Sequence, residues 1–459
     1  MNKLLLTPND VLFFKDGRPM SGSLSGHGGS WPTPNVIAAA LRSALHRAEI
    51  EAVHAHRVKK RDHTHKEERS YQFGSLVSAG PWPVSNEDLW YFSTPADAVC
   101  QKNENGKLWL KLSHKPLLPL EGHESYKSSL PEGLFPTISL LPPSKDENLA
   151  WWSTETFNRY LAGCEVLELP DGGAISGESF QKAEQSVGIG INPETQSIYL
   201  PVKDKNETVE DADGSKFFSS TYLRLADGWK MGVLAEAQDK IEGNPETKKD
   251  LIQVLIPENR HIVVGGQQKV CTVERNTEEK GMQLPKGPEI QGKRVKWVLL
   301  SPAIFPHIGE QTGGWLPNWI HPESMRVELL DGPGKAKAKR LGINAGKPIQ
   351  AKLVAAIIGK PLPITQWHLA REGISFDDEE TLKDNSGPRP TLLAVPPGSV
   401  YYFEADTEED ARKLAAQLNW HGDADQTHTI KNRRSTLLGE KGFGLGVCGT
   451  WKGVESKSN

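Results

Sequence analysis

The sequence predicts an α+β fold built from two tandem units, and three observations support this prediction. Short runs with alternating apolar residues, typical of strands, occur in both halves of the 459-residue chain. A helix with a single apolar stripe is predicted near each end of the chain. Both halves end with strands, a helix and a strand that carries glycines, so the order of elements repeats although the residues do not.

The first half opens with a predicted strand at residues 3–7 and a helix over 33–50. Thr33 suits the N-cap, and Pro34 suits the first helical position, where a missing N–H is tolerated. Asp227-Gly228 is a turn dipeptide between two alternating apolar runs, and it predicts a hairpin over 220–237. A helix over 244–255 and a strand over 261–274, interrupted by Gly265-Gly266, complete this half.

The second half contains predicted strands at residues 296–305, 350–359 and 398–405, while its first helix is unclear. A helix is predicted over 407–420, because Thr407 can cap it and Asp410 stands at the capping-box position. Its apolar stripe consists of Ala411, Leu414, Ala415 and Leu418. The glycine-rich segment at the end of the chain supplies the last strand.

This order, β-α-ββ-α-β, is that of the ferredoxin-like or RRM-type motif. The prediction is therefore two tandem ferredoxin-like domains with long loop insertions. The first spans residues 1–280 and contains a large insertion around 52–200, a stretch rich in Pro, Gly and Ser. The second spans residues 290–459 and ends in the glycine-rich loop.

Composition limits the classes of function. The formal net charge of -4 means that nucleic-acid binding would depend on local basic patches. No run approaches the roughly 18 apolar residues of a membrane span, and the first residues lack the pattern of a signal peptide. Four dispersed cysteines indicate neither a zinc site nor a disulfide framework. We expect a cytoplasmic protein with no membrane partner, metal or cofactor.

The segment LGEKGFGLGVCGTW, residues 438–451, is the first candidate binding site. Its glycines, Gly442, Gly444, Gly446 and Gly449, remove side chains from the main chain, so that backbone N–H groups can approach a phosphate or a sugar. Arg433, Arg434 and Lys441 would supply positive charge. The alternative is a β-bulge or a tight packing crossover.

A second candidate is the run FFKDGRPMSGSLSGHGGSWPTP near the start of the chain. Lys15 and Arg18 resemble two cations on a turn, and Trp31 could stack a base. His27 stands among glycines that include Gly28 and Gly29. Such a run can grip single-stranded RNA, and the alternative is an ordinary flexible loop.

Weaker candidates are Gly265-Gly266 with Lys269, and the basic, histidine-rich residues 54–70. For the latter, a solvated loop and a phosphate-binding arm are the two interpretations, and the histidine spacing fits no metal pattern. No catalytic motif stands out. His27 as a general base for RNA cleavage is set against a simple hydrogen-bonding histidine.

Four segments carry a resemblance to a known family. They are FKDGRPMSG with GHGGSWPTPNVIAAALRSAL, then IVVGGQQKV, AVPPGSVYYFEA and GEKGFGLGVCGTW. In this order the chain resembles the RAMP superfamily of CRISPR proteins, and most closely the third-subunit family of the Cmr (type III-B) RNA-guided effector complex. The segments span most of the chain, although the long insertions match poorly.

The resemblance implies two ferredoxin-like domains and a non-catalytic, RNA-binding structural subunit. Its implied partners are the 5′ tag of the CRISPR RNA, the large palm-domain subunit, and the backbone and small RAMP subunits, with target single-stranded RNA as a further candidate. A metal-independent CRISPR RNA-processing endoribonuclease and a protein-only scaffold are the alternatives. The predicted RNA contacts are Lys15, Arg18, His27, Gly28, Gly29, Trp31, Arg42, Gly265, Gly266, Lys269, Arg433, Arg434, Lys441, Gly442, Phe443, Gly444 and Gly446.

Overall fold

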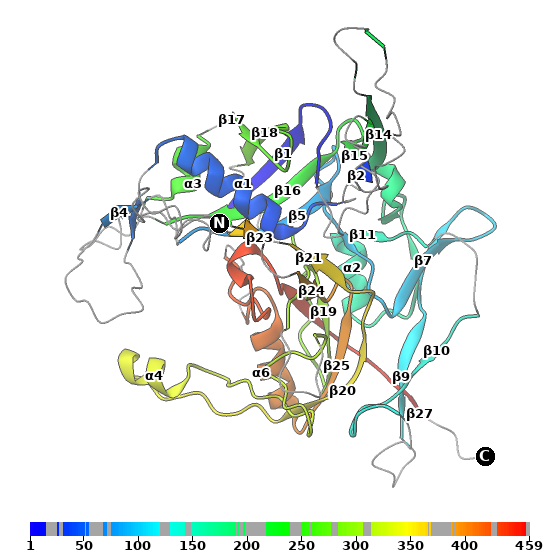
Figure 1. Ribbon diagram of the computed structural model, residues 1–459. Coiled ribbons are helices and arrows are strands. Elements are labelled where there is room, and N and C mark those ends of the chain that lie inside the picture. Colours follow the sequence, from blue (N-terminus) through cyan, green and yellow to red (C-terminus); the bar gives the residue numbers. More distant parts are fainter. Residues whose placement is uncertain are drawn as a thin grey trace, which may run out of the picture.

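The computed structural model describes most of the chain (Figure 1). The described residues are 1–14, 25–26, 31–50, 52–54, 68–70, 75–119, 129–142, 148–189, 191, 196–197, 217–238, 249–257, 259–276, 283–305, 314–365, 367–368, 387–388, 391–423 and 429–455. Helices and mainly antiparallel sheets are mixed along the chain, which confirms the predicted α+β class.

The first large sheet has five strands, and all neighbouring strands are antiparallel. Helices α1 (Pro34–Arg47) and α3 (Leu251–Leu255) pack on one face of it. Leu4 and Leu6 share a hydrophobic cluster with these helices, whereas Leu5 belongs to the cluster on the other face. In spatial order the strands are β17 (Asn259–Val263), β18 (Val270–Asn276), β1 (Asn2–Pro8), β16 (Lys230–Glu236) and β5 (Val77–Val84).

The second large sheet has four antiparallel strands, in the order β20 (Ala351–Ile357), β25 (Val400–Ala405), β19 (Arg294–Leu299) and β26 (Gly446–Thr450). Helix α6 (Glu408–Leu418) packs on one face of it, as the sequence predicts. Thr407 caps this helix, because its hydroxyl accepts a hydrogen bond from the N–H of Asp410 at 3.1 Å.

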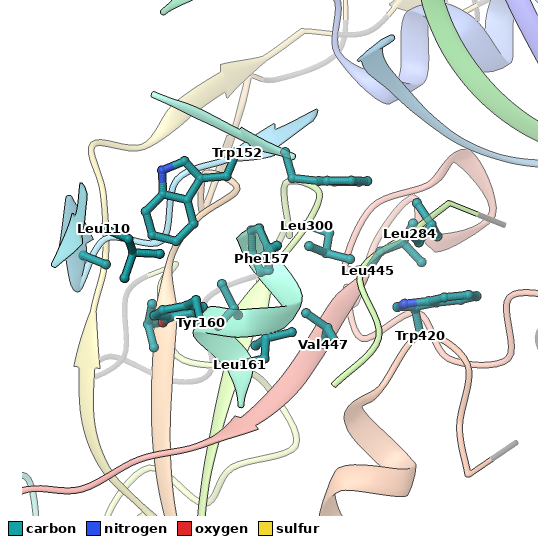
Figure 2. Close-up of a cluster of buried hydrophobic side chains, with 14 of the residues drawn as sticks. Leu110, Trp152, Phe157, Tyr160, Leu161, Leu284, Leu300, Trp420, Leu445 and Val447 are labelled. Atoms are coloured by element: carbon teal, nitrogen blue, oxygen red, sulfur yellow. The ribbon is translucent and has the colours of Figure 1, made fainter. Parts of the chain in front are cut away.

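A central core lies between the two large sheets and contains residues of both. Helix α2 (Thr154–Leu161) lies in it, and Figure 2 shows Phe157 and Leu161 of this helix on the side of Leu445 and Val447, and Tyr160 on the side of Leu110. The first sheet contributes Leu5, Trp82 and Leu234, and the second contributes Val298, Val400 and Tyr402, with Leu300 just after β19. The two halves of the chain are therefore joined through one hydrophobic cluster.

The small sheets build much of the region that the sequence analysis treats as loop insertions. One three-stranded sheet has the order β13 (Ala174–Ile175), β11 (Trp151–Ser153) and β6 (Tyr91–Ser93), and a second has the order β12 (Val166–Leu169), β8 (Leu108–Leu112) and β7 (Ala98–Lys102). A third has the order β10 (Thr137–Ser139), β9 (His114–Leu118) and β27 (Val454–Glu455), and a fourth has the order β14 (Gln181–Ile189), β15 (Phe217–Leu225) and β2 (Ser25–Gly26). The pairs are β21 (Leu362–Ile364), β24 (Leu392–Ala394); β22 (Trp367–His368), β23 (Gly387–Pro388); and β3 (Ala52–His54), β4 (Glu68–Ser70). Helix α4 (Lys335–Leu341) and the short 3-10 helices η1 (Gly177–Ser179) and η4 (Gly439–Lys441) complete the elements used below.

Two predicted strand arrangements are wrong. The turn at Asp227-Gly228 exists, but β15 and β16 on either side of it join different sheets and do not pair with each other. The partner of β16 is β5, which contains Pro81 and Pro83 and which a sequence pattern does not mark as a strand. The predicted strand over 261–274 is a hairpin, because Gly265-Gly266 begin the turn between β17 and β18.

Candidate nucleic-acid interface

Several predicted contact residues lie outside the described residues: Lys15, Arg18, His27, Gly28 and Gly29. Most of the histidine-rich stretch 54–70 lies outside them as well. Both sides of the run that carries Lys15 and Arg18 are nevertheless anchored on β15. Leu12 and Leu223 exchange two main-chain hydrogen bonds of 2.8 Å, and Ser25–Gly26 pair with Ser219 and Ser220. Strand β15 is therefore the support of the predicted N-terminal binding segment.

The Gly265-Gly266 turn packs against the residues that precede this segment. The N–H of Gly266 donates to the carbonyl oxygen of Phe13 at 2.9 Å. Gly265 has a φ of +77°, and a Cβ added to it would lie 2.5 Å from the same oxygen and 2.8 Å from the Phe14 ring. The glycines are thus needed for the close approach of Phe13 and Phe14.

Lys269 leaves this turn and joins an aromatic surface. Its ammonium lies 5.0 Å from the centroid of the Tyr222 ring, and the Phe13 ring lies 5.7 Å from the same ring. The Tyr222 hydroxyl donates to Oε1 of Gln267 at 2.6 Å, which fixes the ring over the turn. We call Phe13, Tyr222, Gln267 and Lys269 the Tyr222 surface. It combines a π-face with a cation, the pair of groups that single-stranded RNA binders use.

Arg224, two residues along β15 from Tyr222, adds no free charge to this surface. Its guanidinium lies 3.0 Å from Asp10 Oδ1 and 2.5 Å from Glu184 Oε2. These hydrogen bonds from Arg224 lower the pKa of both Asp10 and Glu184 and keep the two carboxylates ionised. Lys269 is therefore the cation of the Tyr222 surface with which an RNA phosphate could pair.

The Trp31 side chain is packed among other protein groups. Its indole N–H donates to the carbonyl oxygen of Pro81 at 2.9 Å, and its ring centroid lies 5.9 Å from that of Trp151 and 5.2 Å from that of Phe180. Arg42, in contrast, has an exposed side chain on α1. The indole of Trp31 is held by protein groups on several sides, so only its remaining exposed edge is open to a base.

The terminal glycines pack against the chain itself. A Cβ on Gly442 would lie 2.8 Å from Cα of Ala79, one on Gly444 would overlap the main-chain N of Ser435, and one on Gly446 would overlap the indole of Trp297. Phe443 is 0% exposed and contacts Ile304, Ile364 and Ala394. Among the described residues, the groups close to the main chain of these glycines are other parts of the protein. This arrangement corresponds to the tight packing crossover that the sequence left open for the segment.

The two arginines before the terminal glycines have different environments. Arg434 donates to the main-chain oxygen of Gln417 at 2.6 Å and to its Oε1 at 2.7 Å, and so ties this segment to the end of α6. Arg433 donates to the Ile430 oxygen at 3.3 Å, while its Nε and Nη2 are buried and make no hydrogen bond to any described residue. Burial lowers the pKa of both guanidiniums, which remain charged at neutral pH.

The predicted residues thus fall into two groups that rest on different elements. Gly265 and Gly266 pack on Phe13 and Phe14, and Lys269 lies over Tyr222, whereas the terminal segment packs on β5 and the second sheet. Phe13 and Tyr222 were not among the predicted contact residues. The alternation in STYLRL, which places Tyr222 and Arg224 on one face and Leu223 in the core, could have indicated Tyr222.

The described residues contain no group of three His, Cys, Asp or Glu side chains placed to hold a metal ion. None of the helices in this part of the chain is long and apolar enough to cross a membrane. The four cysteines are free thiols, and burial raises the pKa of Cys100 and Cys271 to about 12, so these thiols are protonated and inert at neutral pH.

Comparisons with known proteins identify the family. No curated protein matches the sequence. Similar solved structures include two of the type III-B Cmr-beta complex bound to cognate target RNA. A chain of the structure with AMPPnP is 11% identical, the match covers 89% of this chain and 86% of that chain, and the TM-score is 0.37. A chain of the structure without AMPPnP is 12% identical, the match covers 87% of this chain and 86% of that chain, and the TM-score is 0.38. A chain of the Csm3-Csm4 subcomplex of the type III-A CRISPR-Cas interference complex is 11% identical, with 89% and 94% covered and a TM-score of 0.27. The family model described as "CRISPR-associated protein (Cas_Cmr3)" matches residues 4–451. The chain therefore belongs to the Cas_Cmr3 family of CRISPR-associated proteins.

Proposed function

We propose that this chain is a non-catalytic, RNA-binding structural subunit of a type III-B (Cmr) CRISPR interference complex. The observation that carries the proposal is the family match over residues 4–451, nearly the whole chain. In this role the chain holds the 5′ tag of the CRISPR RNA and bridges the large palm-domain subunit to the backbone subunits. It acts in the cytoplasm, where guide and target RNA are present.

We propose further that each half of the chain is a ferredoxin-like domain, spanning 1–280 and 290–459. In that fold the strands, numbered along the chain, lie in the spatial order 4-1-3-2. The arrangement β18-β1-β16-β5 agrees with this order if β5 is the second strand and β17 an addition at the edge. The arrangement β26-β19-β25-β20 agrees with it in the second half.

The RNA contact that the structure supports best is the Tyr222 surface together with the segment that follows Phe14. Lys269 offers a cation beside the Tyr222 ring, and Lys15 and Arg18 follow Phe14 in sequence. At the terminal segment, the contact with RNA would be made by Lys441 and not by the packed glycines or the buried guanidinium of Arg433. Cations that contact phosphates position an RNA without reading its bases, which suits a tag of fixed sequence.

RNA–protein crosslinking with mass spectrometry on the assembled particle tests this function. We expect crosslinks between the 5′ tag and the Tyr222 surface, and we expect them to weaken in Lys269→Glu and in Lys15→Glu with Arg18→Glu. Lys360→Glu, the same charge reversal at an exposed loop residue of the second half, is the matched control. Tag crosslinking that is the same in all variants would contradict the assignment of these residues. The absence of any crosslink from this chain in an assembled particle would favour a protein-only scaffold.

A further inference from the structure

A polar cavity of about 560 Å³ opens where β9, the end of α2 and β19 meet. It lies on the second sheet, away from the residues of the Tyr222 surface, and the end of the terminal segment, Thr450 and Trp451, forms part of its lining. Its volume lies within the range of small-molecule sites in proteins, and it is larger than a bare phosphate needs. Nothing in the proposed RNA contacts uses this cavity.

The charges that line the cavity do not balance. Five cationic side chains face three carboxylates, which leaves a formal net charge of +2 with His114 neutral. Each carboxylate has a partner, because Glu165 pairs with Lys115 at 2.6 Å, Glu404 with Arg294 at 3.6 Å and Asp97 with Lys296 at 3.8 Å. The cations beyond these three pairs are Lys293 and Lys452, whose side chains are exposed at the mouth. The cavity therefore attracts an anion.

Lys296 is an unusual residue for its position in the sheet. Its neighbours Val295 and Trp297 face α6, so the alternation of β19 turns Lys296 toward the central core and the cavity. Its side chain is 3% exposed, and its ammonium lies 3.4 Å from the centroid of the Tyr160 ring. A lysine is almost never buried to this extent without a close partner.

The partner that Lys296 has is already satisfied by other groups. Asp97 accepts a hydrogen bond of 2.6 Å from the Tyr160 hydroxyl and one of 2.8 Å from the Tyr402 hydroxyl. The 3.8 Å between the Lys296 ammonium and Asp97 is too long for a hydrogen bond. The ammonium therefore keeps donor capacity at the base of the cavity, although the fold does not need it to complete the hydrogen bonds of Asp97.

We propose that this cavity binds a phosphate group, with Lys296 at its base and Lys293 and Lys452 at its mouth. A phosphate monoester dianion matches the net charge of +2, and the remaining volume admits the ribose that carries it. The phosphate belongs either to a free nucleotide, as a monoester dianion, or to an RNA strand, as a diester with a single negative charge, and both present phosphate oxygens to the same cations. This site is additional to the proposed guide contacts and does not depend on them.

The environment of Lys296 gives the binding a recognisable proton signature. Burial lowers the pKa of Lys296 to about 8, and the nearby Asp97 and Glu165 offset this only in part, while Lys115 adds to it. The other titratable groups beside it are the hydroxyls of Tyr160 and Tyr402, whose pKa values are raised by burial. A bound phosphate would favour the ammonium, so binding near pH 8.5 should take up a proton.

Isothermal titration of the full chain with inorganic phosphate, AMP and a short single-stranded RNA without terminal phosphates tests the site. We expect the wild type to bind AMP or the RNA with proton uptake, measured as a dependence of the heat on the ionisation enthalpy of the buffer. Lys296→Met should weaken binding at least tenfold and abolish the uptake, whereas Lys360→Met should leave both unchanged. AMP binding without RNA binding identifies a nucleotide site, and RNA binding that Lys296→Met weakens identifies a strand phosphate.

The rim provides a second test that does not disturb the core. Lys293→Glu with Lys452→Glu changes two exposed side chains, so the variant should fold and lose binding to the same probes. Binding of none of the three probes by the wild type, or equal binding by the wild type and the rim variant, would overturn the proposal. Neither result would alter the crosslinks expected between the guide tag and the Tyr222 surface, so the two proposals can fail separately.

Discussion

The main chain of Gly442 lies directly against that of Ala79, which joins the last part of the chain to an edge strand of the first sheet. A Cβ on Gly442 would lie 2.8 Å from Cα of Ala79 and 2.9 Å from the carbonyl oxygen of Ser78. Ala79 belongs to β5, and the adjoining 3-10 helix η4 contacts both β5 and α1. Gly442 thus closes the seam between the two halves of the chain.

Substitution of Gly444 by Ala should destabilise the protein more than the same change at Gly106. Both glycines have a left-handed backbone, with φ of +76° and +75°, so both variants lose about 1–2 kcal/mol from backbone conformation. Only at Gly444 would the new methyl overlap the main chain of Ser435, whereas nothing lies within 4 Å at Gly106. Urea unfolding of both variants measures the difference. Equal losses would show that Gly444 is not closely packed against Ser435.

Arg434 and Arg433 should differ in their contribution to stability. Arg434→Met removes two hydrogen bonds to Gln417, and we expect a loss of about 2–3 kcal/mol in the free energy of unfolding. Arg433→Met removes one long bond and two buried donors that have no partner among the described residues, so its effect on stability should be small. Urea unfolding curves of both variants give the comparison, and equal losses or the reverse order would refute it.

The two functions of the Tyr222 side chain can be tested by two substitutions. Tyr222→Phe keeps the ring and removes the hydrogen bond to Gln267, so guide binding should change little. Tyr222→Ala removes the ring, and loss of one stacked base should weaken binding by about 1–3 kcal/mol. Guide affinity of the particle assembled with each variant is the measurement. Equal affinity for the Ala variant and the wild type would exclude stacking at this position.

Stability should depend on pH through Lys296. Its pKa is about 8 in the folded chain against a usual value of 10.5, because burial disfavours the ammonium. Between these values the unfolded chain binds more protons, so the contribution of Lys296 to stability rises with pH, by at most about 1.4 kcal/mol per pH unit. Below pH 8 both states are charged and the slope vanishes.

The contribution of Lys296 is measured as the difference in the free energy of unfolding between the wild type and Lys296→Met. Buried thiols act in the opposite direction, since the pKa of Cys100 and Cys271 is raised to about 12 and deprotonation favours the unfolded chain above pH 9. The free energy of unfolding of the wild type minus that of Lys296→Met should increase from pH 8 to pH 10. A flat difference over this interval would mean that Lys296 titrates normally.

Helices with local signals were predictable from the sequence, and strands with distant partners were not. α1 and α6 start where Pro34 and Thr407 indicate, because capping depends on residues within one turn. β5 was missed because its prolines argue against a strand, yet it lies at the sheet edge, where a missing N–H is tolerated. The prediction of a hairpin at Asp227-Gly228 was wrong, because a turn dipeptide does not specify which sheet each strand joins.

For the candidate site, the sequence indicated Lys269 and its glycines but not what they contact. The glycine pattern reports a close approach of main chain, and it cannot tell whether the neighbour is RNA or protein. At Gly265 the neighbour is Phe13, and at Gly442 it is Ala79, each far away in the sequence. The Lys296 cavity had no sequence signal, because a single lysine in the run RVKWVL resembles a solvent-facing residue of an alternating strand.

The central core has a consequence for how the protein loses its structure. Because Leu5, Phe157 and Val298 share one apolar cluster, neither half can open without exposing the other. The chain should therefore melt in one cooperative calorimetric transition despite its two sheets. A fragment comprising residues 1–280 alone would present an uncovered hydrophobic face and should aggregate when expressed without its counterpart.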